Sequence, residues 1–396
     1  MSRHWPTNRL GDVLHLSDNA VPSTQLDEIN LAGVYSFGRG LFKRGPMSPQ
    51  DTSYKTYNRL VADDYVISQP KAWEGALARV TPEFEGWFLS PVFPTFRANQ
   101  ERLLPTYLEW FCKRESVWLE LQRNSRGIGA RRESVLPEQF LSLEIPLPPL
   151  AEQRRIVARI EELAAQIQEA RALRHETADE VNYLFEATVS RYLANPSSPR
   201  YPLDSRASKI GSGSTPLGGR SAYPSAGIPF VRSLNVRMRT FQWDDIAFIS
   251  PETHAKMAGT TVKPNDVLLN ITGASIGRVA CAPPDLREAN VNQHVAIIRP
   301  DAGLDSRYLM YWLSQPTVQE TINSEQKGAT RQGFTKAQIS AFEVPIPPIS
   351  EQRRIVAELD TLQSEVDALK HHQRDTAAEL DALLPAILDR AFRREL

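Results

Sequence analysis

Two stretches of this sequence combine several cationic side chains with glycines. Residues 123–132 read Arg-Asn-Ser-Arg-Gly-Ile-Gly-Ala-Arg-Arg, and residues 327–336 read Lys-Gly-Ala-Thr-Arg-Gln-Gly-Phe-Thr-Lys. Arginine and lysine bind phosphate oxygens, and arginine can also donate two hydrogen bonds to the edge of a guanine. The alternative for each stretch is a solvated turn with ordinary surface charge. We predict that both loops contact nucleic acid through these residues: Arg126, Gly127, Gly129, Arg131, Arg132, Lys327, Arg331 and Gln332.

Two further glycine-bearing segments have polar side chains that could reach a phosphate. Residues 272–278 read Thr-Gly-Ala-Ser-Ile-Gly-Arg, and residues 211–216 read Gly-Ser-Gly-Ser-Thr-Pro. Backbone N–H groups in a glycine-rich loop can approach an anion closely, but a tight hairpin also needs glycines with positive φ. We name Thr272, Ser275 and Arg278 in the first segment, and Ser212 and Ser214 in the second, as candidate contacts. We expect Asn292, Gln293 and His294 to be structural, because they open an apolar run typical of a buried strand.

Catalytic patterns are weak in this chain. It has neither a Gly-x-x-x-x-Gly-Lys phosphate loop nor a Pro-Pro-Tyr or Pro-Pro-Phe methyltransferase tetrad, and its seven histidines lack zinc-ligand spacing. One pattern, Pro300-Asp301 followed by Glu325-Gln326-Lys327, fits the loose spacing of a magnesium-dependent nuclease. Such a site needs its acids on adjacent strands, whereas Glu325 follows a predicted helix. A nuclease therefore stands as the alternative function, and we expect no cofactor or metal in the chain itself.

Length and composition suit a globular protein of two to three domains. The 396 residues are 41% hydrophobic and 23% charged, with a formal net charge of −1 and two cysteines. Two cysteines do not make a disulfide framework and suit a reducing compartment, so we expect a cytoplasmic protein. No apolar run reaches the roughly 18 residues of a membrane span. Because net charge is close to zero, any nucleic-acid surface must be local.

The sequence contains an internal repeat. Residues 144–158, Glu-Ile-Pro-Leu-Pro-Pro-Leu-Ala-Glu-Gln-Arg-Arg-Ile-Val-Ala, recur 199 positions later as Glu-Val-Pro-Ile-Pro-Pro-Ile-Ser-Glu-Gln-Arg-Arg-Ile-Val-Ala. The prolines predict an extended segment, and a helix is expected where they stop. Paired arginines in the first turn oppose the helix dipole, so we expect a carboxylate partner outside the helix. The repeat therefore predicts two equivalent helices.

Both predicted helices carry the apolar spacing of a coiled coil. The spacing begins at Ile156 and Ile355, turns polar at Arg174 and Gln373, and resumes to Leu184 and Leu383. We predict that the two helices, each about 40 residues long, pair with each other. The alternative is that each helix lies on its own domain. The predicted pairing residues are Ile156, Ile160, Leu163, Ile167, Ile355, Leu359, Leu362 and Val366.

Two larger bodies, residues 1–143 and 201–342, accompany the helical segments 144–200 and 343–396. Each body has short strand-like runs, then an aromatic helix-like stretch (107–111 and 308–312), then its basic loop. We expect strands at 266–271 and 292–298, with comparable strands at 64–68 and 86–90. The bodies thus share a plan while their sequences differ, and the fold class is α+β.

The doubled Pro-x-Pro-Pro-x-x-Glu-Gln-Arg-Arg-Ile-Val motif, with the glycine segments at 211–216 and 273–277, resembles the specificity (S) subunits of type I restriction–modification systems. The resemblance implies two mixed α/β target-recognition domains, 1–143 and 201–342. They would be joined by two conserved antiparallel spacer helices in a pseudo-twofold repeat. The first body lacks the Gly-Ser-Gly-x-Thr-Pro opening and begins instead with Arg9-Leu10-Gly11.

The family implies a non-catalytic subunit that binds double-stranded DNA. Each target domain would read one half of a bipartite site, and the helices would set the gap and dock two modification (methyltransferase) subunits. Restriction (nuclease-translocase) subunits would complete the complex. S-adenosylmethionine, ATP and Mg²⁺ would belong to these partner subunits. A purely structural coiled-coil adaptor is the third reading.

Overall fold

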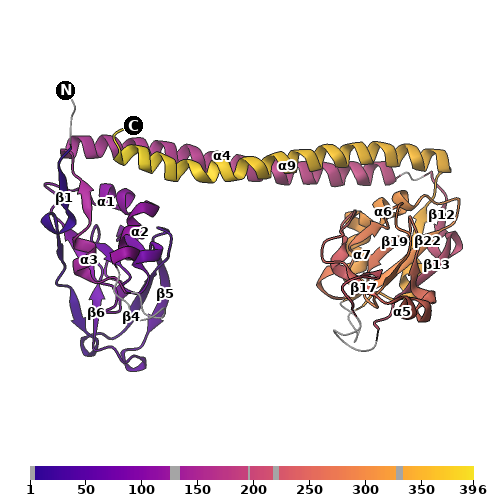
Figure 1. Ribbon diagram of the computed structural model, residues 1–396, viewed down its shortest axis with the longest axis horizontal. Helices are drawn as coiled ribbons and strands as arrows, with labels where there is room; N and C mark the ends of the chain where they lie inside the picture. The colour runs from indigo at the N-terminus through magenta and orange to yellow at the C-terminus, as the bar shows by residue number, and fades with distance from the viewer. Residues whose placement is uncertain (1–4, 125–133, 195–196, 217–222, 327–332) are drawn as a thin grey trace. The chain divides into compact units, whose positions relative to one another are not determined.

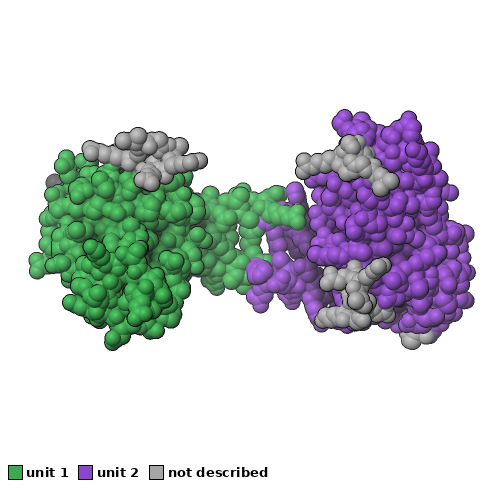
Figure 2. All heavy atoms as spheres, turned by 90° about the horizontal axis from the view of Figure 1, so that it is seen from below, with its two compact units in different colours: residues 1–174, 374–396 green, residues 175–373 purple. Residues whose placement is uncertain are grey.

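Contacts within the chain divide it into two compact units. The computed structural model describes residues 5–124, 134–194, 197–216, 223–326 and 333–396. The first unit holds residues 1–174 and 374–396, and the second holds residues 175–373 (Figure 2). Each unit therefore contains one body together with parts of both long helices, whereas the four segments named from the sequence separate bodies from helices.

The two long helices, α4 (Leu150–Leu193) and α9 (Ile349–Phe392), have 44 residues each (Figure 1). Both begin where the proline run ends, as predicted. In unit 1 the start of α4, at Ile156 and Ile160, shares a buried cluster with Leu388 and Phe392 from the end of α9. In unit 2 the end of α4 instead shares a cluster with the start of α9. The helices are therefore antiparallel, and each also packs on a body.

The predicted apolar seam is followed for most of each helix and then shifts. Leu184 and Leu383 are about half exposed, and the residues one position later, Phe185 and Leu384, turn inward instead. A four-residue step in place of a three-residue step produces such a shift. It occurs at matching positions of the two helices. Of the predicted pairing residues, Leu163 and Leu362 are half-buried, and the buried ones are Ile156, Ile160, Ile167, Ile355, Leu359 and Val366.

Unit 1 is built on two main antiparallel sheets with one parallel contact. The four-stranded sheet has the order β2 (Leu14–Leu16), β10 (Thr95–Ala98), β7 (Tyr65–Ile67) and β8 (Leu77–Arg79). The five-stranded sheet has the order β3 (Ala20–Pro22), β6 (Thr56–Arg59), β9 (Phe88–Leu89), β4 (Ile29–Val34) and β5 (Leu41–Met47). Helices α1 (Pro105–Cys112), α2 (Glu115–Asn124) and α3 (Pro137–Leu141) follow.

Unit 2 repeats this plan. Its first sheet has the order β13 (Ala207–Ser212), β22 (Val295–Pro300), β19 (Val267–Asn270) and β20 (Val279–Cys281). Its second has the order β17 (Ala247–Ile249), β14 (Ile228–Val231), β21 (Ala289–Val291) and β18 (Thr261–Val262), and β15 (Val236–Arg237) pairs with β16 (Thr240–Phe241). Its helices are α5 (Pro251–Lys256), α6 (Ser306–Ser314), α7 (Pro316–Gln326) and α8 (Lys336–Ser340).

Each proline run forms a short strand that belongs to the adjoining body. Strand β11 (Glu144–Pro146) pairs with β1 (Thr7–Arg9), and β23 (Glu343–Pro345) pairs with β12 (Arg200–Pro202). The Tyr107 hydroxyl donates to the Pro146 carbonyl at 2.8 Å, and the Tyr308 hydroxyl donates to the Pro345 carbonyl at 2.9 Å. The two bodies are thus joined to their helices by the same bonds.

A buried carboxylate directly precedes an inner strand of each four-stranded sheet, β7 in unit 1 and β19 in unit 2. Asp64 and Asp266 are each 1% exposed, and each accepts two hydrogen bonds from one arginine, Arg97 or Arg299. This equivalence corrects one prediction. The counterpart of the strand at 292–298 is β10, not the run at 86–90, because the latter forms β9 in the five-stranded sheet. Short apolar runs do not reveal which sheet they join.

Candidate nucleic-acid interface

A glycine loop connects β19 to β20 in unit 2. Gly273 and Gly277 both have positive φ, 72° and 82°, which favours glycine at these two positions. The loop is held on α7, because the Gln319 amide donates to the Gly277 carbonyl at 2.8 Å. A side chain at position 277 would collide with that same amide. The turn therefore favours glycine at both positions, and packing against Gln319 adds a second reason at Gly277.

The segment that follows the second basic loop lies beside this glycine loop. Thr272 forms an isolated antiparallel bridge with Gly333, and the Phe334 amide donates to the Ile271 carbonyl at 2.8 Å. Two segments that are 61 positions apart in sequence, from Thr272 to Gly333, are thereby joined. The predicted contacts Lys327, Arg331 and Gln332 lie outside the described residues, as do Arg126, Gly127, Gly129, Arg131 and Arg132 of the first basic loop.

The glycine loop forms one side of an open cavity of about 480 Å³. Three of the predicted contacts, Thr272, Ser275 and Arg278, line it together. No carboxylate is among the described residues that line it, which also include Ser233, Leu234, Arg237, Gly273, Ala274 and His294. Two guanidinium groups with hydroxyls and an imidazole make a surface suited to phosphate oxygens and base edges.

Arg237 belongs to this cavity although the sequence did not single it out. It is exposed on β15, and its Nε donates to the Gln242 side-chain oxygen at 3.0 Å. The Gln242 amide in turn donates to Asp244 at 2.9 Å. This chain of bonds orients the guanidinium and leaves its terminal N–H groups for a ligand. The alternation Val-Arg-Met-Arg at 236–239 was the available signal, since period-two spacing marks an exposed strand face.

The segment before β22 has a mixed role. Asn292 is buried, and its side-chain oxygen accepts from the His294 amide at 3.1 Å, which fits the predicted structural role. His294 differs, because its ring lines the cavity and hydrogen bonds to the Thr272 hydroxyl. The candidates Ser212 and Ser214 are exposed, but they do not line the cavity.

Unit 1 has an equivalent loop with different side chains, residues 68–76 between β7 and β8. Its amides and carbonyls make matching bonds, for example from the Val135 amide to the Gln69 carbonyl at 2.8 Å. Lys71 pairs with Glu74 at 3.1 Å, and the Trp73 indole donates to the Pro70 carbonyl at 3.0 Å. These side chains are bonded within the loop, so the loop offers a ligand much less than its counterpart does.

One arginine at each helix start forms an ion pair with a glutamate of its own helix. Arg155 pairs with Glu152 at 2.9 Å, and Arg354 pairs with Glu351 at 2.6 Å. Arg155 also donates to the Leu396 main-chain oxygen at 3.3 Å, which lies outside α4. The prediction of a partner outside the helix is therefore wrong for Arg354, whose described partners are Glu351 and Glu358 of α9. Arginine three residues after glutamate on a helix brings the two charges together, which offsets the unfavourable dipole.

The glutamine of the motif is a buried polar residue that the sequence pattern did not single out. The Gln153 amide donates to the Arg102 and Pro148 carbonyls, and its oxygen accepts from the Leu104 amide at 2.9 Å. Gln352 makes the equivalent bonds to Gly303, Pro347 and Asp305, and both glutamines are fully buried. These six bonds fix each helix start to its body.

The pattern that suggested a nuclease does not form a metal site in the described structure. Asp301 accepts from the Gly303 amide at 2.8 Å and lies 3.7 Å from Arg206, so it stabilises a turn. Glu325 falls in α7 and not on a strand. Across the described ranges, no three His, Cys, Asp or Glu residues are grouped to hold a metal ion. Among those same ranges, every helix is too short or too polar to cross a membrane.

A comparison with protein-family models identifies the architecture. The model for the type I restriction modification DNA specificity domain matches residues 2–174 and 209–379, and therefore most of the chain. The chain belongs to this family. The two matched ranges correspond to the two halves of the internal repeat, so each half is one specificity domain.

Individual members of the specificity family are similar to this chain at about a quarter identity. The chain is 26% identical over 278 residues to the EcoBI specificity subunit of Escherichia coli, covering 64% of this chain and 58% of that protein. It is 24% identical over 293 residues to the EcoKI specificity subunit of Escherichia coli strain K12, covering 69% and 62%. The matched part is thus less than two thirds of the length of these two relatives.

Two solved structures match the fold over the full length. A chain from a study of complex assembly and conformational transition of the type I R-M system is 27% identical, with a TM-score of 0.76. The match covers 100% of this chain and 99% of that chain. The HsdS subunit from Thermoanaerobacter tengcongensis is 26% identical with a TM-score of 0.65, covering 98% of that chain and 100% of this one.

Proposed function

We propose that this chain is the DNA specificity subunit of a type I restriction–modification complex, with each unit reading one half of a bipartite double-stranded site. The observation that carries the proposal is a shared scaffold with exchanged surfaces. The two units repeat the same buried bonds at Asp64 and Asp266 and at Gln153 and Gln352, while the side chains of their exposed loops differ. Two readers of unlike half-sites need this combination.

In unit 2 the reading surface is the cavity with Arg237, Thr272, Ser275, Arg278 and His294. Arginine bonded to guanine, and hydroxyls bonded to phosphate, would use the groups that line it. The neighbouring basic loop would add Lys327, Arg331 and Gln332. In unit 1 the basic loop would make most of the DNA contacts, because the side chains of the loop at 68–76 are bonded within that loop. The residues of this basic loop are Arg126, Gly127, Gly129, Arg131 and Arg132.

The paired helices would hold the two readers in register and dock two methyltransferase subunits, with restriction subunits completing the enzyme. S-adenosylmethionine, ATP and Mg²⁺ would act in those subunits, and this chain would contribute recognition without a catalytic residue. Such a complex works on chromosomal DNA, so we place it in the cytoplasm. The relatives named as type I specificity subunits support this assignment.

The test is single-molecule methylome sequencing of the host with and without this gene. We expect one bipartite motif, two short half-sites around a fixed gap, to lose methylation when the gene is deleted. Replacing residues 201–342 with the same domain of another family member should then change one half-site and leave the other. A change in both half-sites, or no methylation that depends on the gene, would contradict the proposal.

A further inference from the structure

One arginine locks the body of unit 2 to both long helices. Arg239 has a positive φ of 62° at the turn between β15 and β16, and its side chain is 13% exposed. The guanidinium donates to Glu186 of α4 at 2.8 Å and to Gln363 of α9 at 3.1 Å. It also donates to the Ser314 hydroxyl at 3.3 Å and lies 4.6 Å from the Phe185 ring centre.

The repeat identifies the corresponding place in unit 1. The helices are related by 199 positions and the helical parts of the bodies by 201, as the Gln153/Gln352 and Tyr107/Tyr308 bonds show. Applied to the four groups around Arg239, these offsets give a proline, an alanine, a lysine and a leucine. The equivalents of Glu186, Gln363, Ser314 and Phe185 are Pro385, Ala164, Lys113 and Leu384.

All four of these equivalents line one cavity in unit 1. Its volume is about 600 Å³, and its wall also includes Phe37, Trp110 and Trp118. Phe37 is at the turn between β4 and β5, has a positive φ of 63°, and is 63% exposed. A bulky residue rarely adopts that backbone conformation and rarely stays so exposed. Unit 1 thus has an open aromatic cavity where unit 2 inserts its own arginine.

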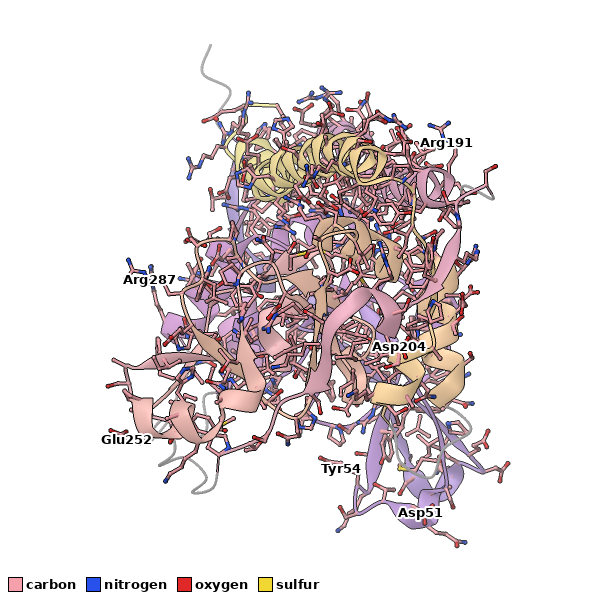
Figure 3. All side chains as sticks on the ribbon, turned by 90° about the vertical axis from the view of Figure 1, so that its right-hand side faces the viewer. Asp51, Tyr54, Arg191, Asp204, Glu252 and Arg287 are labelled. Carbon is pink, nitrogen blue, oxygen red and sulfur yellow. The ribbon has the colours of Figure 1, made fainter. Side chains whose placement is uncertain are left out.

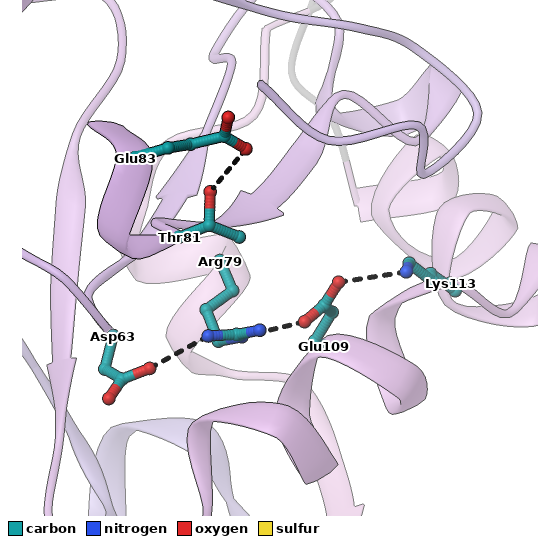
Figure 4. A network of polar contacts seen from close by, with 6 residues as sticks. All are labelled: Asp63, Arg79, Thr81, Glu83, Glu109 and Lys113. Carbon is teal, nitrogen blue, oxygen red and sulfur yellow. Dashed lines mark hydrogen bonds and ion pairs between the residues drawn. The ribbon is translucent and has the colours of Figure 1, made fainter. Parts of the chain in front are cut away.

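The cavity cannot hold a cation as its counterpart does. The carboxylate and amide that bind Arg239 are replaced by proline and alanine, and Lys113 adds a positive charge. Figure 4 shows how Lys113 is fixed: its Nζ lies 2.9 Å from Glu109, which also accepts from Arg79 at 2.8 Å. The cavity therefore favours an apolar or aromatic guest.

The rim of the cavity favours a negative charge beside that guest. Three cations and one carboxylate are in the lining, and the carboxylate, Asp381, is paired with Arg171 at 2.6 Å. Within the described ranges, the buried Nε of Arg171 has no hydrogen-bond acceptor. The exposed guanidinium of Arg39 stacks 4.9 Å from the Tyr35 ring centre and has no carboxylate partner among the described residues. Both groups could donate to an incoming carboxylate.

We propose that this cavity binds an aromatic side chain on an acidic segment of a methyltransferase subunit, and so forms a docking site present in unit 1 alone. The proposal rests on the proposed function, which supplies that partner. The aromatic ring would fill the space between Trp110, Trp118 and Leu384, and neighbouring carboxylates would bond to Arg39 and Arg171. Buried aromatic anchors with charged neighbours are typical of the residues that dominate protein interfaces.

The test measures the binding of the purified methyltransferase subunit of the same system to the full chain, by native mass spectrometry. Ala164→Trp fills the cavity from α4, and Ala172→Trp places the same side chain at an exposed position of the same helix. Arg39→Glu reverses the rim charge, and Arg39→Lys retains it. We expect Ala164→Trp and Arg39→Glu to weaken one of the two binding events by about tenfold or more, as loss of an anchor does. The Ala172→Trp control should change it by less than about twofold, and Arg39→Lys, which keeps the charge but not the planar guanidinium, should weaken it less than Arg39→Glu does.

DNA binding by each variant, measured separately, shows whether the chain is folded and functional. Unchanged affinity at both positions in Ala164→Trp and in Arg39→Glu, with DNA binding intact, would overturn the docking site and leave the proposed function standing. Equal weakening by Ala172→Trp would also overturn it. Failure of the unmodified chain to bind DNA would instead refute the proposed function, and the docking site with it.

Discussion

The loops at 68–76 and 270–278 occupy equivalent places in the two units and share some backbone bonds, but their side chains differ. In each, the first amide donates to the last carbonyl, from Ser68 to Ala76 at 2.9 Å and from Asn270 to Arg278 at 2.8 Å. Each has a glycine of positive φ at its penultimate position, and each glycine would collide with α2 or α7 if it carried a side chain. The closing bond and the packed glycine are therefore shared, whereas the Gly75 amide donates to the Ala72 carbonyl and the Gly277 amide to the Asn270 carbonyl.

The side chains between those bonds are exchanged. Thr272, Ser275 and Arg278 of unit 2 correspond to Pro70, Trp73 and Ala76 of unit 1. A loop with three groups that can bond to a ligand is replaced by one with none at these positions. Buried polar bonds thus recur in both units while the exposed positions differ, and on the proposed function these exposed positions would determine what is bound. Mutations of the two classes should therefore have separate effects.

The buried carboxylates should give the largest effect on stability. Asp266→Ala leaves Arg299 without its partner, and breaking a buried ion pair costs about 3 to 5 kcal/mol. Asp64→Ala should cost less, because the Arg97 side chain is 48% exposed and that of Arg299 is 23% exposed. The measurement is denaturant unfolding of the full chain, with hydrogen exchange assigning the loss to one unit. The exposed Asp285→Ala is the control, and equal losses for all three variants would contradict the ranking.

The glutamine anchors should come next. Gln153→Leu and Gln352→Leu each leave one amide and two carbonyls buried without partners. Each such group destabilises the fold by about 1 to 3 kcal/mol, and water that reaches the groups reduces this cost. We expect each variant to lower the free energy of unfolding of its own unit by about 2 to 3 kcal/mol, as measured by denaturant unfolding. Arg154→Ala and Arg353→Ala, exposed neighbours on the same turns, should stay within about 0.5 kcal/mol. A glutamine variant as stable as its arginine control would show that the anchor is dispensable.

The exposed loop should affect binding and not folding. Arg278→Ala and Arg237→Ala should weaken DNA binding by about 1 to 3 kcal/mol without lowering the free energy of unfolding. If the contact is to a phosphate, the salt dependence should also flatten by about one unit of slope. Binding is measured by fluorescence anisotropy over a salt series. Arg287→Ala is the control, since Arg287 is exposed on unit 2 (Figure 3) and is not among the residues that line the cavity. Equal losses for Arg287 would indicate a diffuse charge effect.

The smallest effect should be a pH dependence confined to unit 1. Burial alone would raise the pKa of Glu109, but Lys113 and Arg79 outweigh it and hold that pKa below its ordinary value. Glu109 therefore stabilises unit 1 above its unfolded pKa of about 4.3. That stabilisation is lost as the pH falls through the lower folded pKa. The free energy of unfolding of unit 1 should fall less between pH 5 and pH 3 in Glu109→Gln than in the unmodified chain. The same pH dependence in both proteins would exclude Glu109 as the cause.

Much of the architecture was predictable because the repeat is local and periodic. The prolines and the apolar spacing after them predicted two helices that start where the prolines stop, and the helices begin at Leu150 and Ile349. The spacing failed at Leu184 and Leu383, because the bodies reach the helices at that point and the inward-facing residues become Phe185 and Leu384. Tertiary packing overrode the heptad, and one sequence alone does not report tertiary packing.

The candidate site was predictable only in part. Glycine spacing indicated the loop of Thr272, Ser275 and Arg278, and these three side chains do share a cavity. Arg237 was missed because it comes from a hairpin about 35 residues earlier, and only the folded chain brings it there. Gln153 was missed for a related reason, since a glutamine reads as a surface residue and its partners are backbone groups elsewhere. The predicted contacts in the two basic loops stay predictions.

The partners of the two buried glutamines are all main-chain atoms. Because every amino acid except proline offers the same amide and carbonyl, the sequence of a body can diverge without weakening the joint. A body taken from another specificity subunit needs only to place one main-chain carbonyl and one main-chain amide beside the same glutamine. Exchange of whole bodies by recombination would then produce folded proteins with new targets in one step, with no compensating change in the helices.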